Sequence, residues 1–255
     1  MKKLIITIGL VPLLALGQQD FNEQFQGTGF VLHYDLGDAA QESIKEYTQE
    51  GLQKISDFFD KPFKKKVNVY LFLNRARLDA QWRKDWGMPE FESECWMVGS
   101  GILSRLDLLS PSAWQAEACE HDSQDSVEIR QLVVHELTHV LHSDYNQSPE
   151  FNNINNIDWF VEGLATYASG QLDKERYEPM VAFVKETGGP TELANFWKGQ
   201  HRYALSGSIV KYIDQAYGRK VLSELMLYSD VNDILSRLGL TEEGLIKAWR
   251  ETIVK

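Results

Sequence analysis

Two stretches of the sequence decide how this chain folds: VVHELTHVLH at residues 133–142 and WFVEGLATY at residues 159–167. Their apolar residues recur at helical spacing, so each stretch predicts a helix that faces the core. Among the apolar residues stand ionisable ones, of which His135, Glu136, His139 and Glu162 have the spacing of a functional site. Because ionisable groups are rarely buried without a partner, these side chains predict a functional centre where the two helices pack together.

The spacing of the two histidines points to a metal ion. Residues four positions apart lie on the same face of a helix, so the imidazoles of His135 and His139 can both reach one Zn²⁺ ion. Glu162 is the candidate third ligand, and two histidines with one glutamate leave a fourth zinc position for water. The pattern predicts one Zn²⁺ per chain, in a catalytic rather than a structural site. The alternative is a surface helix with two solvated histidines, and a solvated Glu162 near a helix start.

Glu136 leaves the helix about 100° round from His135, so it is predicted to lie close to the metal without binding it. From there a carboxylate can accept a proton from metal-bound water, which is the general-base role in zinc hydrolases. Glu136 is therefore predicted to be a catalytic residue.

The motif HELTH followed by WFVEGLATY resembles the gluzincins, zinc metallopeptidases with a His-Glu-x-x-His helix and a glutamate ligand on a following helix. The likeness is greatest to the peptidase MA-like group over about residues 126–170, and it continues more weakly through 203–218. This resemblance implies an α+β, zincin-like fold, with a small mixed or antiparallel sheet packed on the motif helix and a mostly helical part after it. It also implies that paired strands at 96–110 hold an extended peptide along a sheet edge.

The resemblance assigns roles to individual residues. The three candidate ligands would hold the zinc ion, and Glu136 would act as base and proton shuttle. Related peptidases use a downstream tyrosine or histidine as the donor to the oxyanion, which makes Tyr203 and His201 the candidates here. Tyr203 fits equally well as a core residue of an amphipathic helix.

Two features depart from the pattern of these peptidases. Many gluzincins place an acidic residue four positions after the ligand glutamate to orient a histidine, and Thr166 stands there in this chain. The Gly-x-Met-Glu-Asn signature of related aminopeptidases is absent, so the sequence gives no support for amino-terminal trimming.

The remaining pattern predicts strands and helices in the first part of the chain and mostly helices in the second. Strands are expected at 29–34, 67–73, 96–101 and 103–110, and the first helices at 38–60, 75–86, 125–143 and 159–169. Further helices are expected at 174–186, 203–217, 219–228, 231–238 and 242–252.

Helix starts and the domain organisation can also be predicted. Asp125 is a candidate N-cap with Glu128 as its capping-box partner, and Asp158 is a candidate cap of the next helix. We expect a single domain over 18–255. Its α+β part covers 18–145 and its helical part covers 146–255, beginning with an Asn-rich loop.

Residues 1–17 have the pattern of a secretory signal peptide. Two lysines precede an apolar run at 4–16, and ALG at 15–17 offers small residues before Gln18. The run of 13 residues is shorter than the roughly 20 that span a bilayer, which disfavours a membrane anchor. The pattern predicts a secreted or periplasmic protein with no stable membrane insertion after cleavage.

The net charge and the cysteine content indicate which partners and which cysteine pairing to expect. The 255 residues include 26 Lys and Arg against 37 Asp and Glu, a net charge of −11, and loss of two lysines with the signal peptide would give −13. Such an acidic surface repels phosphate backbones, so a nucleic-acid partner is not expected. Cys95 and Cys119 are the only cysteines, and they fit either one disulfide or two buried thiols. The sequence does not indicate the oligomeric state.

Three other histidines receive no metal role. His142 follows His135 by seven residues, about 10 Å further along the helix axis, so it is not expected to bind the same ion. His33 and His121 lie in a predicted strand and a polar loop, without a partner pattern.

Together these features predict a zinc-dependent metallopeptidase that hydrolyses peptide bonds of a peptide or protein substrate, through a zinc-bound water activated by Glu136. Two other functions are compatible with the sequence. One is a non-catalytic binding module that keeps the fold, and the other is a zinc hydrolase that acts on a bond other than a peptide bond.

The signal-peptide pattern predicts that the exported chain begins at Gln18, because cleavage follows the small residue at position 17. Mass spectrometry of the N-terminal peptide of exported protein measures this start directly. Recovery of an exported chain that still carries residues 1–17 would contradict the prediction.

Overall fold

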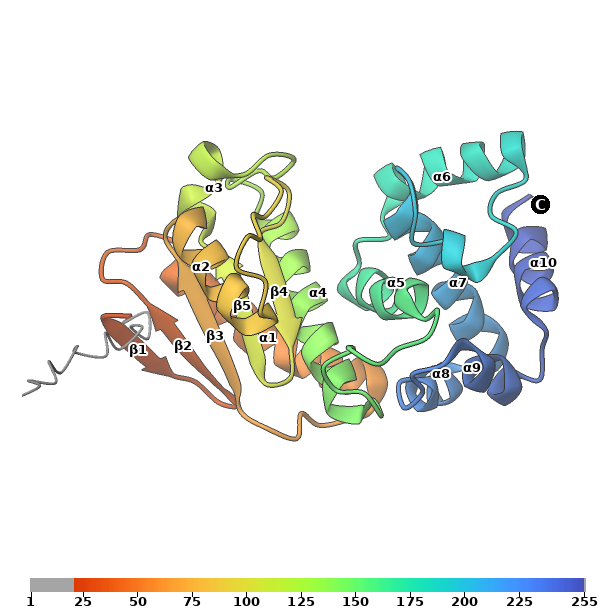
Figure 1. Ribbon diagram of the computed structural model, residues 1–255, viewed down its shortest axis with the longest axis horizontal. Coiled ribbons are helices and arrows are strands. Elements are labelled where there is room, and N and C mark those ends of the chain that lie inside the picture. Colours follow the sequence, from red (N-terminus) through yellow and green to blue (C-terminus); the bar gives the residue numbers. More distant parts are fainter. Residues whose placement is uncertain (1–20, 255) are drawn as a thin grey trace, which may run out of the picture.

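The chain forms a five-stranded sheet with helices on both faces and a group of helices beside it (Figure 1). This computed structural model describes residues 21–254, so the expected signal peptide at 1–17 lies outside the described residues. The strands in spatial order are β1 (Glu23–Gln26), β2 (Phe30–Tyr34), β3 (Val67–Phe72), β5 (Arg105–Leu109) and β4 (Gly99–Ile102). β2, β3 and β5 run parallel, whereas β1 and β4 pair antiparallel at the two edges. The fold is therefore α+β with a mixed sheet.

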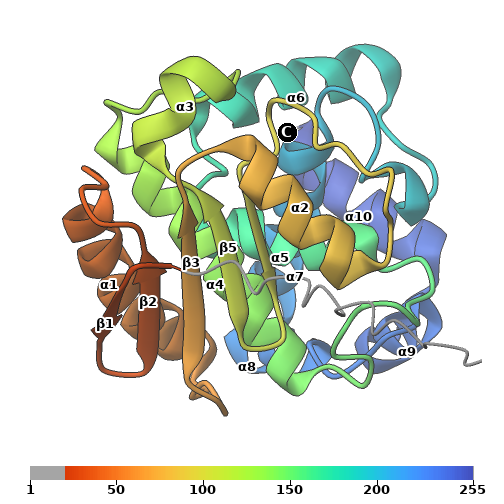
Figure 2. The ribbon, with the colours of Figure 1, turned by 60° about the vertical axis from the view of Figure 1, so that its left-hand side comes forward.

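Buried aliphatic side chains hold the central strands together. Val69 of β3 lies beside Leu32 of β2 and Leu106 of β5, and all three are fully buried. Helices α1 (Gln41–Phe59) and α4 (Ser126–Tyr145) cover one face of the sheet, and α2 (Arg75–Trp86) crosses the other (Figure 2). Helix α4 contributes to two apolar clusters: Val133 and Leu137 pack with the sheet, whereas Val134 and Leu141 pack with the helices of the second part of the chain.

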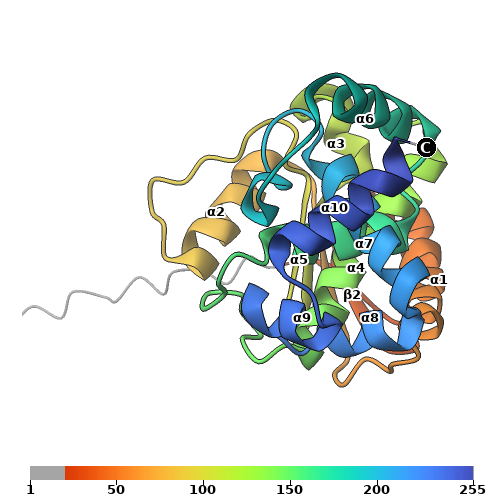
Figure 3. The same ribbon diagram turned by 90° about the vertical axis from the view of Figure 1, so that its right-hand side faces the viewer.

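The second part of the chain is helical, as predicted. It contains α5 (Asp158–Ser169), α6 (Lys174–Thr187), η1 (Leu193–Asn195), α7 (Arg202–Tyr217), α8 (Arg219–Leu225), α9 (Val231–Leu238) and α10 (Glu242–Ile253). Helix α10 packs on α6 and α7 (Figure 3). Its Trp249 is fully buried and donates the indole N–H to Ser208 Oγ of α7 at 3.0 Å. Within residues 21–254, no helix combines the length and the apolar composition that crossing a membrane requires.

Several predicted boundaries are wrong, and three elements were not predicted. β1, η1 and α3 (Pro111–Glu117) are short and contain too few apolar residues at regular spacing for the sequence pattern to identify them. The strand expected to start at residue 96 starts at Gly99, because the preceding carbonyl groups bind a side chain instead of a strand. The Arg75 guanidinium donates to the backbone oxygens of Cys95 at 2.9 Å and Met97 at 2.8 Å.

The predicted helix caps are only partly correct. Asp125 caps α4, since its Oδ1 accepts two backbone N–H groups at 2.8 and 3.1 Å. The capping box is wrong, because the carboxylate of Glu128 accepts the backbone N–H of Asp122 rather than that of Asp125. Asp158 is not the cap of α5: Ile157 occupies that position and Asp158 is the first helical residue.

Cys95 and Cys119 form a disulfide, with Cα atoms 5.3 Å apart, so the alternative of two free thiols is excluded. The bridge joins the segment before β4 to the segment after α3. Together with Arg75, the disulfide holds the chain where it enters β4.

Two glycines allow backbones to approach one another at the centre of the molecule. A Cβ atom on Gly101 of β4 would lie 2.1 Å from the backbone oxygen of Glu136 in α4. One on Gly163 of α5 would lie 2.3 Å from the backbone oxygen of Ser206 in α7. Any larger side chain would collide with these carbonyl groups, so the glycines let β4 pack on α4 and α5 pack on α7.

Replacement of Gly101 by alanine is expected to destabilise the fold, because the added methyl group would collide with the Glu136 carbonyl. Overpacking of a close contact costs about 1–3 kcal/mol, which urea denaturation measures as a lower midpoint. Ser100→Ala in the same strand is the matched control, with an expected change within about 0.5 kcal/mol. A Gly101→Ala protein as stable as the wild type would show that β4 does not pack directly on α4.

Candidate metal centre

Helices α4 and α5 bring the four ionisable residues singled out by the sequence to one place. His135, Glu136 and His139 of α4 are only 5%, 7% and 8% exposed. The side chain of Glu162, on α5, is 25% exposed. The surface helix with solvated histidines, the alternative left open by the sequence, is therefore excluded.

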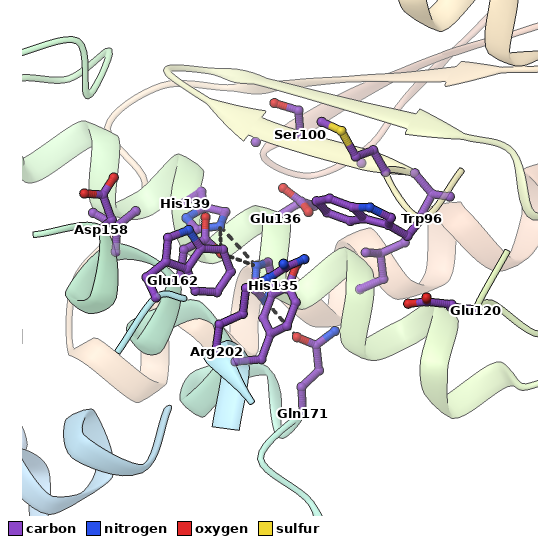
Figure 4. Close-up of a pocket in the computed structure, with 18 of the residues that line it drawn as sticks. Trp96, Ser100, Glu120, His135, Glu136, His139, Asp158, Glu162, Gln171 and Arg202 are labelled. Atoms are coloured by element: carbon purple, nitrogen blue, oxygen red, sulfur yellow. Dashed lines mark hydrogen bonds and ion pairs between the residues drawn. The ribbon is translucent and has the colours of Figure 1, made fainter. Parts of the chain in front are cut away.

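Three ligand-type atoms converge on one point (Figure 4). The Nε2 atoms of His135 and His139 are 3.1 Å apart. Oε2 of Glu162 lies 3.5 Å from the first nitrogen and 3.7 Å from the second. Tetrahedral ligands at about 2.0–2.1 Å from a zinc ion would be separated by about 3.4 Å. The donor set and its spacing therefore fit a Zn²⁺ ion.

Gln171 orients His135. Its Oε1 accepts a hydrogen bond from Nδ1 of His135 at 2.7 Å, so in the neutral ring the Nε2 lone pair faces the other two donors. Metal-binding histidines commonly donate their second N–H in this way. In many gluzincins the residue that corresponds to position 166 orients a metal-binding histidine. In this chain Thr166 is buried against Gly207 instead. Sequence reasoning missed Gln171 because it lies in the loop after α5, outside the motif.

Glu136 is confined beneath β4, outside the group of three ligand atoms. A Cβ atom on Gly99 would lie 3.2 Å from its Oε1, and the backbone N–H of Gly101 donates to its carboxylate. Burial raises the pKa of Glu136 to about 7, and the charge of Glu162 adds to this effect while that of His135 opposes it. A carboxyl group with this pKa exchanges a proton near neutral pH, as a general base must.

Of the other three groups, Glu162 and His139 are held in the forms that bind a metal. Burial alone would raise the pKa of Glu162, but the charge of His139 and the hydrogen bond with His135 outweigh it, and the pKa lies below its usual value. Burial lowers the pKa of His139 to about 4. Burial also acts to lower the pKa of His135, but the hydrogen bond with Glu162 and the nearby carboxylates outweigh it and raise the pKa. An ionised Glu162 and a neutral His139 are the forms that coordinate metals.

Only one of the two candidate oxyanion donors lines the cavity that contains these residues. Tyr203 lines it, with its ring centroid 6.3 Å from that of His135. Burial, together with the charge of Glu162, raises the pKa of Tyr203 to about 12, so the phenol stays protonated and can donate. His201 packs its ring on Phe183 and lines a smaller, neighbouring cavity.

The centre opens into a cavity of about 790 Å³. β4 contributes Ser100 to its wall, and the segment before β4 contributes Trp96. Figure 4 shows Asp158 and Glu120 toward opposite ends, with the histidines between them. Because β4 is an edge strand, one row of its backbone groups is not paired within the sheet.

Two further histidines have partners that the sequence did not indicate. His121 contacts Glu128 through Nδ1 at 2.6 Å, and its Nε2 lies 3.0 Å from the backbone oxygen of Trp96. His142 is fully buried beside Phe151, and burial lowers its pKa to about 3. His142 is not part of the convergent group.

No known protein family and no curated protein sequence matches this chain. A solved structure of a two-domain M1 zinc metallopeptidase, a mutant bound to L-arginine, aligns with a TM-score of 0.48 at 14% sequence identity. The alignment covers 88% of this chain and 48% of the other, so this chain spans about half of that protein's length. A similarity of this size does not define a family, so the function has to be inferred from the residues of the site.

Replacement of Gln171 by alanine is expected to weaken Zn²⁺ binding about 10-fold to 100-fold, because His135 would lose the acceptor that orients its ring. Competition with a chromogenic chelator measures the affinity. Thr166→Ala is the control, since that side chain packs on Gly207 and not on a histidine. Equal losses in both variants would mean that Gln171 has no specific effect on the ring.

Proposed function

We propose that the protein is a zinc-dependent metallopeptidase of zincin-like fold, in which His135, His139 and Glu162 hold one Zn²⁺ ion. The observation that carries the proposal is the convergence of these three ligands beside a fourth buried group, Glu136, that does not join them. Structural zinc sites commonly have four protein ligands, whereas residues 21–254 offer three at this point. All three line the cavity, so a substrate has access to the remaining position.

When bound, zinc would supply a Lewis acid that polarises a carbonyl group and acidifies water. Glu136 would accept a proton at its carboxylate and deliver it to the leaving amine. Two features favour this role: a pKa of about 7, and the N–H of Gly101, which fixes the carboxylate beside the ligands. A base held in this way needs no rearrangement before it reacts.

Tyr203 is the residue that we propose as the oxyanion donor. Its phenol remains protonated at neutral pH, and preorganised donors of this kind stabilise the charge that develops on an attacked carbonyl. The ring of Trp197, with centroids 4.8 Å apart, packs edge-on against it and restricts its movement.

A peptide is the substrate that best suits the cavity. The exposed edge of β4 runs along one wall, and such an edge can pair with an extended chain through backbone hydrogen bonds. A binding module would not need a buried base beside the metal. A zinc hydrolase that acts on another bond would not need the strand edge.

The proposal includes export from the cytoplasm. The signal-peptide pattern at 1–17 supports it. The disulfide between Cys95 and Cys119 supports it independently, because such bonds persist in oxidising compartments and are rare in the cytosol.

Glu136→Gln tests the mechanism, since glutamine keeps the size of the side chain but cannot accept the proton. Zinc content, measured by elemental analysis, should stay near one ion per chain. Turnover of a peptide library, followed by mass spectrometry, should fall by at least about 10²–10⁴. Glu178→Gln, on the exposed face of α6, is the matched control and should behave as the wild type.

The two measurements separate the alternatives. Loss of zinc together with activity would mean that Glu136 supports the metal rather than the chemistry. Full activity with zinc retained would exclude Glu136 as the base. A zinc-loaded wild-type protein that cleaves no peptide would favour the binding module or a different bond.

A further inference from the structure

A positively charged side chain in the cavity has no role in the proposed mechanism. Arg202, the first residue of α7, lines the same cavity as the three candidate ligands. Its guanidinium lies over three aromatic rings, 4.8 Å from the centroid of Trp96, 5.4 Å from that of Trp197 and 5.2 Å from that of Tyr203. Trp96 lies before β4, whereas Trp197 and Tyr203 belong to the helical part of the chain, so the guanidinium contacts both parts.

Within residues 21–254 Arg202 forms no close ion pair, although its positive charge helps to lower the pKa of Glu162 and its side chain hydrogen-bonds that of Tyr203. The sequence carries 37 Asp and Glu against 26 Lys and Arg, and arginines elsewhere pair with them, as Arg219 does with Asp214 and Arg237 with Glu224. None of the ion pairs within residues 21–254 includes Arg202, and its buried Nε has no hydrogen-bond partner. A buried donor without an acceptor is costly, so this group is expected to acquire one from outside the chain.

The position of Arg202 places such an acceptor next to the reaction centre. It adjoins Tyr203 in sequence, and both residues line the cavity that contains Glu162; Figure 4 shows Arg202 beside Glu162. A planar guanidinium stacked on aromatic rings presents a rigid fork of donors that suits a carboxylate better than a neutral carbonyl. With a metal ion bound by the three candidate ligands, Arg202 would hold a charged group of the same substrate near that ion.

We propose that Arg202 binds a carboxylate of the substrate and thereby directs the protein toward peptides that carry one close to the cleaved bond. The inference rests on the proposed function, because it concerns the substrate of the same site. The carboxylate belongs either to a peptide C-terminus or to an aspartate or glutamate side chain, and both present the same two oxygens to the guanidinium.

Binding of three matched peptides tests this assignment. The probes are acetyl-tetra-alanine with a free C-terminus, the same peptide as its C-terminal amide, and the acetylated amide with glutamate at the third position. The full chain carries Glu136→Gln to prevent turnover, and calorimetry and tryptophan fluorescence report binding, since Trp96 and Trp197 flank Arg202. At least one carboxylate peptide should bind about 10-fold to 100-fold more tightly than the neutral amide. The tighter of the two identifies the source of the carboxylate.

Substitutions of Arg202 supply the second part of the test. Arg202→Gln should abolish the difference between charged and neutral peptides, and Arg202→Lys, which keeps the charge but not the fork, should restore part of it. Arg237→Gln removes a positive charge on α9, outside the cavity, and should leave the difference intact. Circular dichroism melting checks that each variant is folded, and Arg202→Lys still tests the proposal if Arg202→Gln is not.

The possible failures are distinguishable from one another. Equal affinity for charged and neutral peptides, no measurable binding of any peptide, or a difference that survives Arg202→Gln would overturn the role of Arg202. If the wild type nevertheless cleaves amidated peptides, the proposal that the protein is a peptidase stands, even though Arg202 does not bind a substrate carboxylate. Carboxylate binding that depends on Arg202 in a protein that cleaves no peptide would instead overturn the peptidase.

Discussion

Burial of four ionisable side chains where two helices pack together is the constraint on which the rest of this structure depends. His135, Glu136, His139 and Glu162 each lose hydration in an apolar interior, and this loss is tolerated only where charges, hydrogen bonds or a metal replace the water. The four side chains compensate one another only in part. Two are carboxylates, and two imidazole nitrogens face each other at 3.1 Å. A divalent cation at their centre would satisfy all three converging acceptors at once.

The surrounding fold keeps this centre compact and oriented. Gly101 and Gly163 let a strand and a helix approach carbonyl groups that any side chain would strike. Gln171 fixes the ring of His135 through its far nitrogen, while Arg75 and the disulfide hold the segment that leads into β4. The resulting cavity brings the carboxyl group of Glu136, the phenol of Tyr203 and the guanidinium of Arg202 near the three candidate ligands. This arrangement supports the proposed catalytic function.

The features that sequence reasoning predicted are those that depend on local periodicity or on one motif. The helix at HELTH and the helix that carries Glu162 are long and strongly apolar, so their pattern identifies them without tertiary information. His135 and His139 were predicted as ligands because residues four apart share a helix face, and Glu162 because it is a carboxylate within a mainly apolar helix. Their convergence, with α5 packed on α4, agrees with that expectation.

What the sequence did not predict depends on contacts between distant segments. Gln171 lies in a loop and meets His135 only after the chain has folded. The strand start at Gly99 is set by Arg75, which lies on another element. Glu128 forms no capping box because its carboxylate accepts the backbone N–H of Asp122 instead of that of Asp125. From the sequence, Arg202 cannot be distinguished from other helical residues, because the aromatic rings around it are brought together only by the fold.

The central claim is that two histidines and one glutamate hold a zinc ion with an open position. X-ray absorption at the zinc edge, on the purified protein loaded with one equivalent of Zn²⁺, tests it most directly because it reports the ligands themselves. The account predicts two imidazole nitrogens at about 2.0–2.1 Å, with oxygen ligands completing a low-coordinate shell. The imidazole signal should fall by half in His139→Ala. A shell of oxygen ligands alone, or a spectrum unchanged in that variant, would contradict the account.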